Sequence, residues 1–383
     1  MLRLRLLLLL CLALLWAGCG NSNDELPPIT NNPGGPTWTA PNPALLASRL
    51  QQIVDANLAD SNTPGALVGV FTPNGNWTSA TGFADVAGQR PISFNDVSAW
   101  RSITKSLTVT IVLQLVAEGD LELDAPVGDY VDGVPNGENI TLRQLAAMRS
   151  GLFNYTQDPA FQQAFGGDLT ADWTDAEILS YAFSHPVNFA AGTQYEYSNT
   201  NTILLGVVAE TVTGRSLEQL LTERLLVPLG MQNSTYLLGT QFPSPYVRGY
   251  VYEDEDDSFF EVISNTTALS GAGAMVGTHA DLRTWGHALV RGNLLPPALQ
   301  AQRFLGQPTN GGPTYDSYGL GMGSIRGWWG HTGNGLGYEC CVFTEPTTGS
   351  QIVIFVNATN DRADVPFDMA DEILDVLNWP IQR

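Results

Sequence analysis

Residues 102–118 read SITKSLTVTIVLQLVAE, and this stretch predicts a long buried helix. Apolar side chains recur on every turn, which is typical of a helix inside a core rather than on a surface. Gly119 follows and marks the predicted end, because glycine readily adopts the left-handed conformation that terminates helices. Ser102 and Lys105 stand three positions apart, so their side chains are expected on one face of the helix.

Strand-like segments lie near both ends of the chain. The first predicted hairpin joins residues 66–71 to 77–83 through Pro73-Asn74-Gly75, and the second joins 338–343 to 351–356. Because hairpins need partners to bury their apolar faces, we expect one antiparallel sheet built from both termini.

Helical periodicity accounts for most of the remaining sequence. It marks residues 44–58 before the first hairpin and 369–377 after the second. Residues 123–257 read mostly as helices joined by loops, with examples at 142–148, 175–183 and 202–213. The fold class is therefore predicted as α+β, with an all-helical subdomain (123–257) inserted into an α/β part formed by 44–122 and 258–383.

The amino-acid composition argues against some classes of binding partner. The 383 residues are 44% hydrophobic and 14% charged, with a formal net charge of −21, so a sizeable core is expected. An acidic surface repels phosphate backbones and anionic head groups, which argues against nucleic acid and against electrostatic membrane binding. We expect a monomer.

The N-terminus predicts export. Residues 1–5 are basic, residues 6–16 form an apolar run too short to span a bilayer, and Ala17-Gly18-Cys19 follows. This resembles the lipobox of bacterial lipoproteins, in which Cys19 would be acylated, although Trp16 stands where that pattern has leucine. The alternative is ordinary cleavage near Ala17. Residues 1–19 are thus a signal, 20–43 a tether and 44–383 the folded domain of a periplasmic, outer-membrane-anchored or secreted protein.

The cysteines of the domain predict no disulfide. Cys340 and Cys341 are adjacent in a strand-like run, where neighbouring side chains point to opposite faces, so both are expected as packed thiols. No zinc-type spacing occurs, and no metal or cofactor is expected.

The Ser102–Lys105 pair indicates nucleophilic catalysis. Serine hydrolases need a base beside the hydroxyl, and a Gly-x-Ser-x-Gly elbow with its histidine is missing from this sequence. Lys105 is the only lysine among 17 basic residues, and lysine, unlike arginine, can give up its proton when buried. The competing interpretation is an incidental lysine whose stem lines an apolar surface.

Two later segments supply candidate partners. In Tyr195-Glu-Tyr-Ser-Asn199, the side chains of Tyr197 and Asn199 point the same way in an extended turn. A phenol beside a cationic lysine can take the proton of Ser102, and the Asn199 amide can orient Lys105 and a substrate carbonyl. The alternative is a core tyrosine followed by a helix cap.

Gly330-His-Thr-Gly333 precedes the strand at Tyr338. Its glycines permit close approach of a substrate backbone, and Thr332 offers a hydroxyl to a substrate carboxylate. The N–H of Asn334 can join that of Ser102 in an oxyanion hole. His331 as the base of a Ser-His-Asp triad remains the rival interpretation.

Taken in order, Ser102-Ile-Thr-Lys105, Tyr197-Ser-Asn199 and His331-Thr-Gly333 resemble the three motifs of the penicillin-recognising serine hydrolases. That family includes D-Ala-D-Ala carboxypeptidases, class C β-lactamases and related esterases, and His331-Thr-Gly333 looks closest to the secreted carboxypeptidases. The resemblance implies a five-stranded antiparallel sheet flanked by helices, acylation of Ser102, and hydrolysis without metal or cofactor.

The same resemblance defines the substrate question. The related carboxypeptidases carry a carboxylate-binding arginine shortly after the segment matching Tyr318-Gly-Leu-Gly321, where the nearest candidate here is Arg326; Asn334 also replaces a threonine. Three hypotheses follow: a carboxypeptidase acting on peptidoglycan-type peptides, an esterase or β-lactamase with the same catalytic set, and a catalytically silent penicillin-binding or scaffold protein.

Overall fold

The computed structural model describes residues 43–73, 75–253, 258–292, 294–309, 315–359 and 364–377. The predicted signal, the acylation site at Cys19 and the tether to residue 42 lie outside these residues. Within them, no helix has the length and apolar character needed to cross a membrane.

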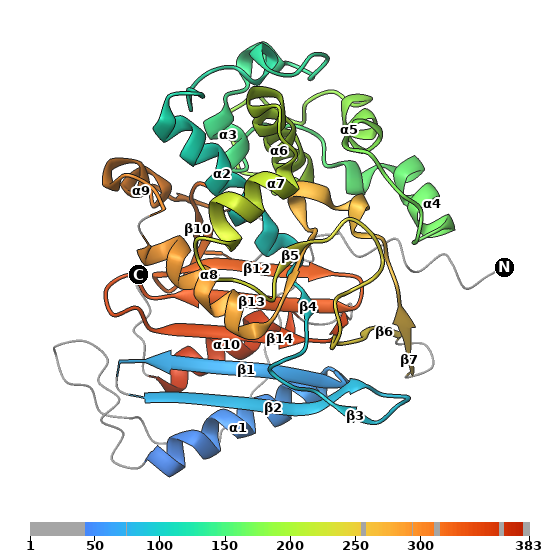
Figure 1. Ribbon diagram of the computed structural model, residues 1–383, viewed down its shortest axis with the longest axis vertical. Helices are drawn as coiled ribbons and strands as arrows, with labels where there is room; N and C mark the ends of the chain where they lie inside the picture. The colour runs from blue at the N-terminus through green and yellow to red at the C-terminus, as the bar shows by residue number, and fades with distance from the viewer. Residues whose placement is uncertain are drawn as a thin grey trace.

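The central sheet is antiparallel and has nine strands in the order β3-β2-β1-β14-β13-β12-β11-β10-β9 (Figure 1). Its long strands are β1 (Gly65–Thr72), β2 (Gly75–Asp85), β12 (Trp328–Gly335), β13 (Tyr338–Thr344) and β14 (Gln351–Val356). The added strands are β3 (Arg90–Pro91), β9 (Gln307–Pro308), β10 (Ser317–Tyr318) and β11 (Gly323–Ile325). The expected count of five is therefore wrong, because short segments beside the long strands extend the sheet at both edges.

Pairing between β1 and β14 closes the sheet across the chain. The register runs from Ala66 opposite Val356 to Phe71 opposite Gln351, so the N-terminal hairpin pairs with the C-terminal one. This confirms that one antiparallel sheet is built from both ends of the sequence.

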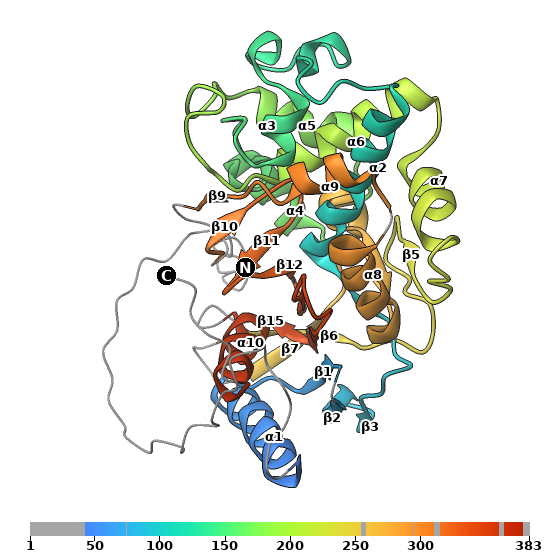
Figure 2. The same ribbon diagram turned by 90° about the vertical axis from the view of Figure 1, so that its left-hand side faces the viewer.

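Helices cover both faces of this sheet (Figure 2). On one face, α1 (Pro43–Asp60) and α10 (Val365–Val376) pack together and enclose an apolar cluster with β1, β13 and β14. On the other, α2 (Thr104–Glu118) and α8 (His279–Arg291) belong to a second, larger cluster. As predicted, α2 ends at Gly119, whose φ is +86°.

The remaining helices gather mainly at one end of the molecule, at the top of Figure 1. They are α3 (Leu142–Ala146), α4 (Pro159–Gly167), α5 (Asp175–Phe183), α6 (Asn199–Thr213) and α7 (Leu217–Leu221), while α9 (Pro297–Arg303) lies near α2. Short helical turns are η1 (Arg101–Ile103), η2 (Val127–Asp129), η3 (Gly137–Asn139), η4 (Tyr155–Gln157), η5 (Thr222–Leu226), η6 (Thr266–Ala268) and η7 (Ser270–Ala272).

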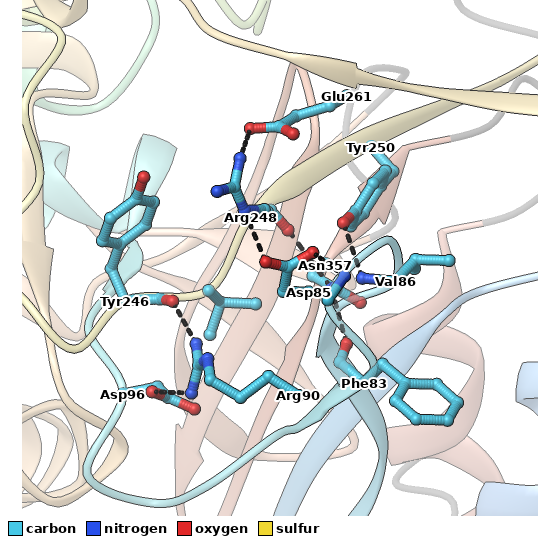
Figure 3. Close-up of polar contacts among 12 residues, drawn as sticks. Phe83, Asp85, Val86, Arg90, Asp96, Tyr246, Arg248, Tyr250, Glu261 and Asn357 are labelled. Atoms are coloured by element: carbon cyan, nitrogen blue, oxygen red, sulfur yellow. Dashed lines mark hydrogen bonds and ion pairs between the residues drawn. The ribbon is translucent and has the colours of Figure 1, made fainter.

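Two small sheets complete the fold, one of β4 (Ser98–Ala99), β8 (Met275–Gly277) and β5 (Thr235–Tyr236), the other of β15 (Ala358–Thr359), β6 (Gly249–Glu253) and β7 (Ser258–Val262). Polar contacts tie the second one to the end of β2 (Figure 3). Arg248 forms ion pairs with Asp85 and Glu261, while Asn357 donates to the Phe83 carbonyl at 3.0 Å.

Candidate active site

Ser102 lies in the turn η1 that leads directly into α2. The preceding residue, Arg101, has a φ of +48°, which is unfavourable for a side-chain-bearing residue. Its buried guanidinium holds this conformation by donating to the Leu336 carbonyl at 2.6 Å, between β12 and β13. The nucleophile candidate therefore sits on a turn that is anchored to the sheet.

Lys105 is fully buried on the first turn of α2. Its Nζ lies 2.9 Å from Ser102 Oγ and 2.8 Å from the carbonyl oxygen of Ala272. Thr108, one turn further along α2, donates to the neighbouring carbonyl of Gly271 at 2.8 Å. The turn η7 thus holds the lysine amine against the serine hydroxyl, as the spacing of the two residues requires.

Tyr197 lies just before α6 and faces the same point. Lys105 Nζ is 5.0 Å from the centroid of its ring, within cation–π distance. The ring centroid is also 6.3 Å from those of Tyr318 and His331. The fold therefore brings together Ser102, Lys105 and Tyr197, the three residues predicted to be catalytic.

The strand β12 passes directly against η1. A Cβ on Gly333 would lie 2.3 Å from the Trp100 carbonyl oxygen and 2.8 Å from Cys340 Sγ. Only glycine permits this approach, because real Cβ atoms essentially never come so close to other heavy atoms. The strand is thereby held beside Ser102.

His331 is fully buried, and both ring nitrogens have partners. Nε2 is 3.0 Å from Tyr318 Oη, while Nδ1 is 2.5 Å from the Thr332 carbonyl oxygen. A carbonyl only accepts, so Nδ1 carries the proton and Nε2 accepts from the phenol. Burial, reinforced by the charge of Lys105, lowers the pKa of His331 to about 3, so the ring is neutral near pH 7.

Thr332 is engaged by a residue that sequence reasoning missed. Its backbone N–H donates to Tyr315 Oη at 2.8 Å, and its Oγ1 lies 2.8 Å from the same phenol oxygen. Tyr318, although part of a segment quoted for the family resemblance, was not expected beside His331. The only local signal is the pair of tyrosines three positions apart, which points equally well to ordinary core residues.

The two asparagine candidates make polar contacts around the site. Asn199 begins α6; its N–H is 3.2 Å from Asn154 Oδ1, and its Nδ2 is 3.4 Å from Asn154 Oδ1 and from Thr156 Oγ1. These contacts tie it to the loop at Asn154 and Thr156. Asn334 is exposed near the end of β12, and its amide donates to Glu339 at 3.0 Å.

Arg326 does not join this group. It lies between β11 and β12 with a φ of +46°, and its guanidinium contacts Asp371 at 2.8 Å and Asp375 at 2.5 Å. Both acids belong to α10, on the face of the sheet opposite α2. The side chain proposed to bind a substrate carboxylate is thus directed away from Ser102.

Two further expectations concern the state of the cysteines and the presence of a metal site. Cys340 and Cys341 are buried free thiols, as predicted. In the part of the chain that the structure describes, no group of three or more His, Cys, Asp or Glu residues is placed to hold a metal ion.

The hydroxyl of Ser102 meets a buried lysine at the start of a helix, and this helix packs against an antiparallel sheet. Such an arrangement is typical of active sites of the β-lactamase and transpeptidase class. The family model described as Beta-lactamase matches residues 50–375. The chain therefore belongs to the beta-lactamase family, a family of serine hydrolases, and the resemblance to penicillin-recognising enzymes is confirmed.

Solved structures agree with this assignment. The D-stereospecific amidohydrolase from Streptomyces sp. is 31% identical with a TM-score of 0.73, over 82% of this chain and 94% of that one. The D-amino acid amidase from Ochrobactrum anthropi SV3 shares the fold with a TM-score of 0.76, over 87% of this chain and 99% of that one, at 23% identity.

Similar sequences carry several names. Esterase EstB of Burkholderia gladioli is 30% identical over 56% of this chain and 58% of its own length. A D-aminopeptidase of Cereibacter sphaeroides is 30% identical over 50% of this chain and 36% of its own length. Each match spans less than two thirds of the relative's own length, and the two relatives carry different activities in their names.

Proposed function

We propose that this protein hydrolyses amides or esters of short acyl substrates, with D-aminoacyl amides as the first class to test, through an acyl-enzyme on Ser102. The observation that carries the proposal is the 2.9 Å contact between Lys105 Nζ and Ser102 Oγ, in a buried setting bounded by Tyr197 and β12. His331 is not placed as a competing base, because its Nδ1 contacts the Thr332 carbonyl and Tyr315 Oη while its Nε2 contacts Tyr318 Oη.

In the proposed acylation, Ser102 Oγ attacks the substrate carbonyl carbon and its proton passes to the pair Lys105–Tyr197. In the resting arrangement Lys105 Nζ donates to Ser102 Oγ and to the Ala272 carbonyl. Once the amine is deprotonated, its lone pair replaces the hydrogen aimed at Ser102 and accepts the serine proton. The N–H groups of Ser102 and Asn334 are the proposed donors to the oxyanion.

Collapse of the tetrahedral intermediate breaks the bond between the carbonyl carbon and the leaving group. The leaving amine or alkoxide takes the proton held by the pair Lys105–Tyr197, and the acyl group remains on Ser102 Oγ. A water molecule then attacks the acyl-enzyme ester and gives a proton to the same pair. The bond between the carbonyl carbon and Ser102 Oγ breaks, Oγ takes that proton back, and the acid leaves.

The placement of Arg326 bears on the choice of substrate. A carboxypeptidase needs a cationic partner for the terminal carboxylate of its peptide, and this guanidinium is engaged with α10. The D-stereospecific amidohydrolase at 31% identity supports amide cleavage instead. D-Ala-D-Ala carboxypeptidase activity on peptidoglycan-type peptides is the second candidate, favoured by the motif His331-Thr-Gly333.

The test is a substrate panel with the wild-type domain and Ser102→Ala. It comprises D- and L-alanine amides, short-chain p-nitrophenyl esters, an acyl-D-Ala-D-Ala peptide and benzylpenicillin, with intact-mass detection of adducts. We expect turnover of a D-aminoacyl amide or an ester and none by the variant. Failure of every substrate to react or to label Ser102 would leave only the silent scaffold hypothesis.

We also propose export through residues 1–19 with acylation of Cys19. Expression of the full chain, cell fractionation and mass measurement of the mature N-terminus test this directly. Cys19→Ser is the informative variant: it should release the protein from the membrane fraction if Cys19 is acylated, and leave its distribution unchanged if cleavage occurs near Ala17.

A further inference from the structure

The edge of β12 that faces β11 is covered by a strand over only part of its length. Pairing with β11 runs from Ile325 opposite Trp328 to Gly323 opposite Gly330. The chain before Gly323 then turns away, because Gly321 has a φ of +72° and its N–H donates to the Ala146 carbonyl at 2.9 Å. From His331 onward, this edge therefore continues beyond β11.

Tyr315 occupies the next position along the edge. Its ring lies over Gly323, where a Cβ would come within 2.4 Å of the ring, and its oxygen accepts the Thr332 N–H at 2.8 Å. The same oxygen is 2.8 Å from Thr332 Oγ1, and both side chains are buried. The phenol thus takes the place that the backbone of a paired chain would otherwise fill.

In the proposed acylation, a substrate on Ser102 would lie along this edge. Gly333 touches the turn that carries Ser102, and N–H groups two residues apart point to the same edge of a strand, so Thr332 and Asn334 share it. A substrate that extends along β12 from Asn334 would next reach Thr332. At Thr332 the substrate meets the phenol of Tyr315, which already contacts the N–H and the hydroxyl of Thr332.

The negative charge of a carboxylate further disfavours its binding at Thr332. Burial of a carboxylate is costly unless donors or cations receive it. At this position the Thr332 donors are covered by Tyr315, and Arg326 is paired with Asp371 and Asp375. An amide or ester group ending there carries no charge and loses far less on desolvation.

We infer that Tyr315 is a specificity-determining residue that closes the substrate edge of β12 at Thr332 and excludes substrates bearing a free carboxylate there. The inference rests on the proposed function and deepens it. The selected substrates are those whose leaving part is short and uncharged.

The experiment compares an acyl-D-Ala-D-Ala peptide with its C-terminal amide, in wild type and in Tyr315→Phe. The variant keeps the ring over Gly323 and removes only the oxygen. We expect wild type to favour the amide, and kcat/KM for the carboxylate peptide to rise about tenfold in Tyr315→Phe relative to the amide, the scale of one or two released hydrogen bonds. Both phenols contact His331, Tyr315 at Nδ1 (3.3 Å) and Tyr318 at Nε2 (3.0 Å), but of the two only Tyr315 contacts Thr332. Tyr318→Phe is therefore the matched control, and in it the ratio should not change.

An unchanged ratio in Tyr315→Phe, or an equal change in Tyr318→Phe, would overturn the inference. Calorimetric binding of the two peptides to Ser102→Ala and to Ser102→Ala/Tyr315→Phe separates it from the proposed function, since binding needs no turnover. A carboxylate preference that appears only in the double variant would support the role of Tyr315 even if the intact protein were inactive. If neither protein bound either peptide, the inference about Tyr315 would be overturned.

Discussion

At the scale of single residues, Lys105 and His331 lie in one cluster but have different partners. The lysine nitrogen meets Ser102 Oγ, whereas the histidine nitrogens meet Tyr318 and the Thr332 carbonyl. A base must lie within hydrogen-bond distance of the proton that it removes, and Lys105 satisfies this condition. The geometry thus favours the lysine over a Ser-His-Asp triad.

Replacing Lys105 with arginine tests this assignment. Arginine keeps a positive charge but cannot give up its proton, so we expect kcat to fall by at least about a hundredfold. In Lys105→Met, which has a neutral side chain of similar length, kcat should fall by as much. Thermal unfolding of both variants checks that the buried site still folds, and substantial activity in a folded Lys105→Arg protein would contradict the proposal.

Replacing His331 with glutamine tests the rival triad. Because the pKa of His331 is lowered to about 3, the ring does not titrate between pH 5 and 8, and it cannot produce a limb of the rate profile there. We therefore expect log(kcat/KM) against pH to keep the same apparent pKa values in His331→Gln, even if its height changes. Loss of an acidic limb near pH 6.5 in the variant would instead identify His331 as the base.

At the scale of elements, the site depends on the contact between β12 and η1. The two segments lie more than two hundred residues apart in sequence, and they meet where Gly333 lacks a side chain. Arg101 adds a second connection through the Leu336 carbonyl. The distance between Ser102 and the substrate edge is therefore determined by main-chain packing.

Gly333→Ala should separate these two elements. Its Cβ would lie 2.3 Å from a backbone oxygen, so β12 must move, and a displacement of this size at the reacting centre costs about a hundredfold in kcat/KM. Gly335→Ala is the matched control two residues along the same strand. Its Cβ would be 3.1 Å from Arg101 Cδ instead of 2.3 Å from a backbone oxygen, so a shift of a few tenths of an ångström relieves the contact and we expect a smaller loss. Equal losses would show that the close approach is not the cause.

At the scale of the whole molecule, the pairing of β1 with β14 gives the sheet two apolar faces. Burial on these faces includes titratable groups as well as apolar ones. His279 at the start of α8 is almost fully buried, with Nε2 3.0 Å from the Val353 carbonyl oxygen of β14. Burial lowers the pKa of His279 from 6.5 to about 4, opposed by that hydrogen bond and assisted by Arg283.

This pKa shift predicts a pH dependence of stability. The unfolded chain binds a proton at His279 near pH 6.5 and the folded one only near pH 4, so the free energy of unfolding falls as pH drops through this window. From pH 7 to pH 5 the loss is about 2 kcal/mol. His279→Gln keeps a donor for the Val353 carbonyl but does not titrate, so its urea midpoint should change less between pH 7 and pH 5.

The comparison with the variant is needed because other groups act in the opposite direction. Burial raises the pKa of Asp175 and of Asp364 to about 6, so their contributions to stability are lost as pH rises through 6. These contributions are common to both proteins and cancel in the difference. Identical pH profiles for wild type and His279→Gln would contradict the assigned role of His279.

Much of the fold was predictable because it depends on local periodicity. The long helix ended at Gly119 as expected, and both hairpins formed near their predicted bounds. The number of strands was not predictable, since β9, β10 and β11 are two or three residues long and exist only beside a longer neighbour. The ion pairs of Arg326 were not predictable for a similar reason, because α10, far along the chain, presents two acids to it.

The chemistry that is local to one element follows directly from the order of residues along the chain. Ser102 and Lys105 share a helix face because of their spacing, and the lone lysine marks the only long basic side chain able to lose a proton. The surroundings of this pair depend instead on the folded arrangement: the Ala272 carbonyl that holds the lysine, the neutral His331, and Tyr315 on the β12 edge. These contacts join residues brought together by sheet closure and helix packing, and no local pattern of residues records such distances.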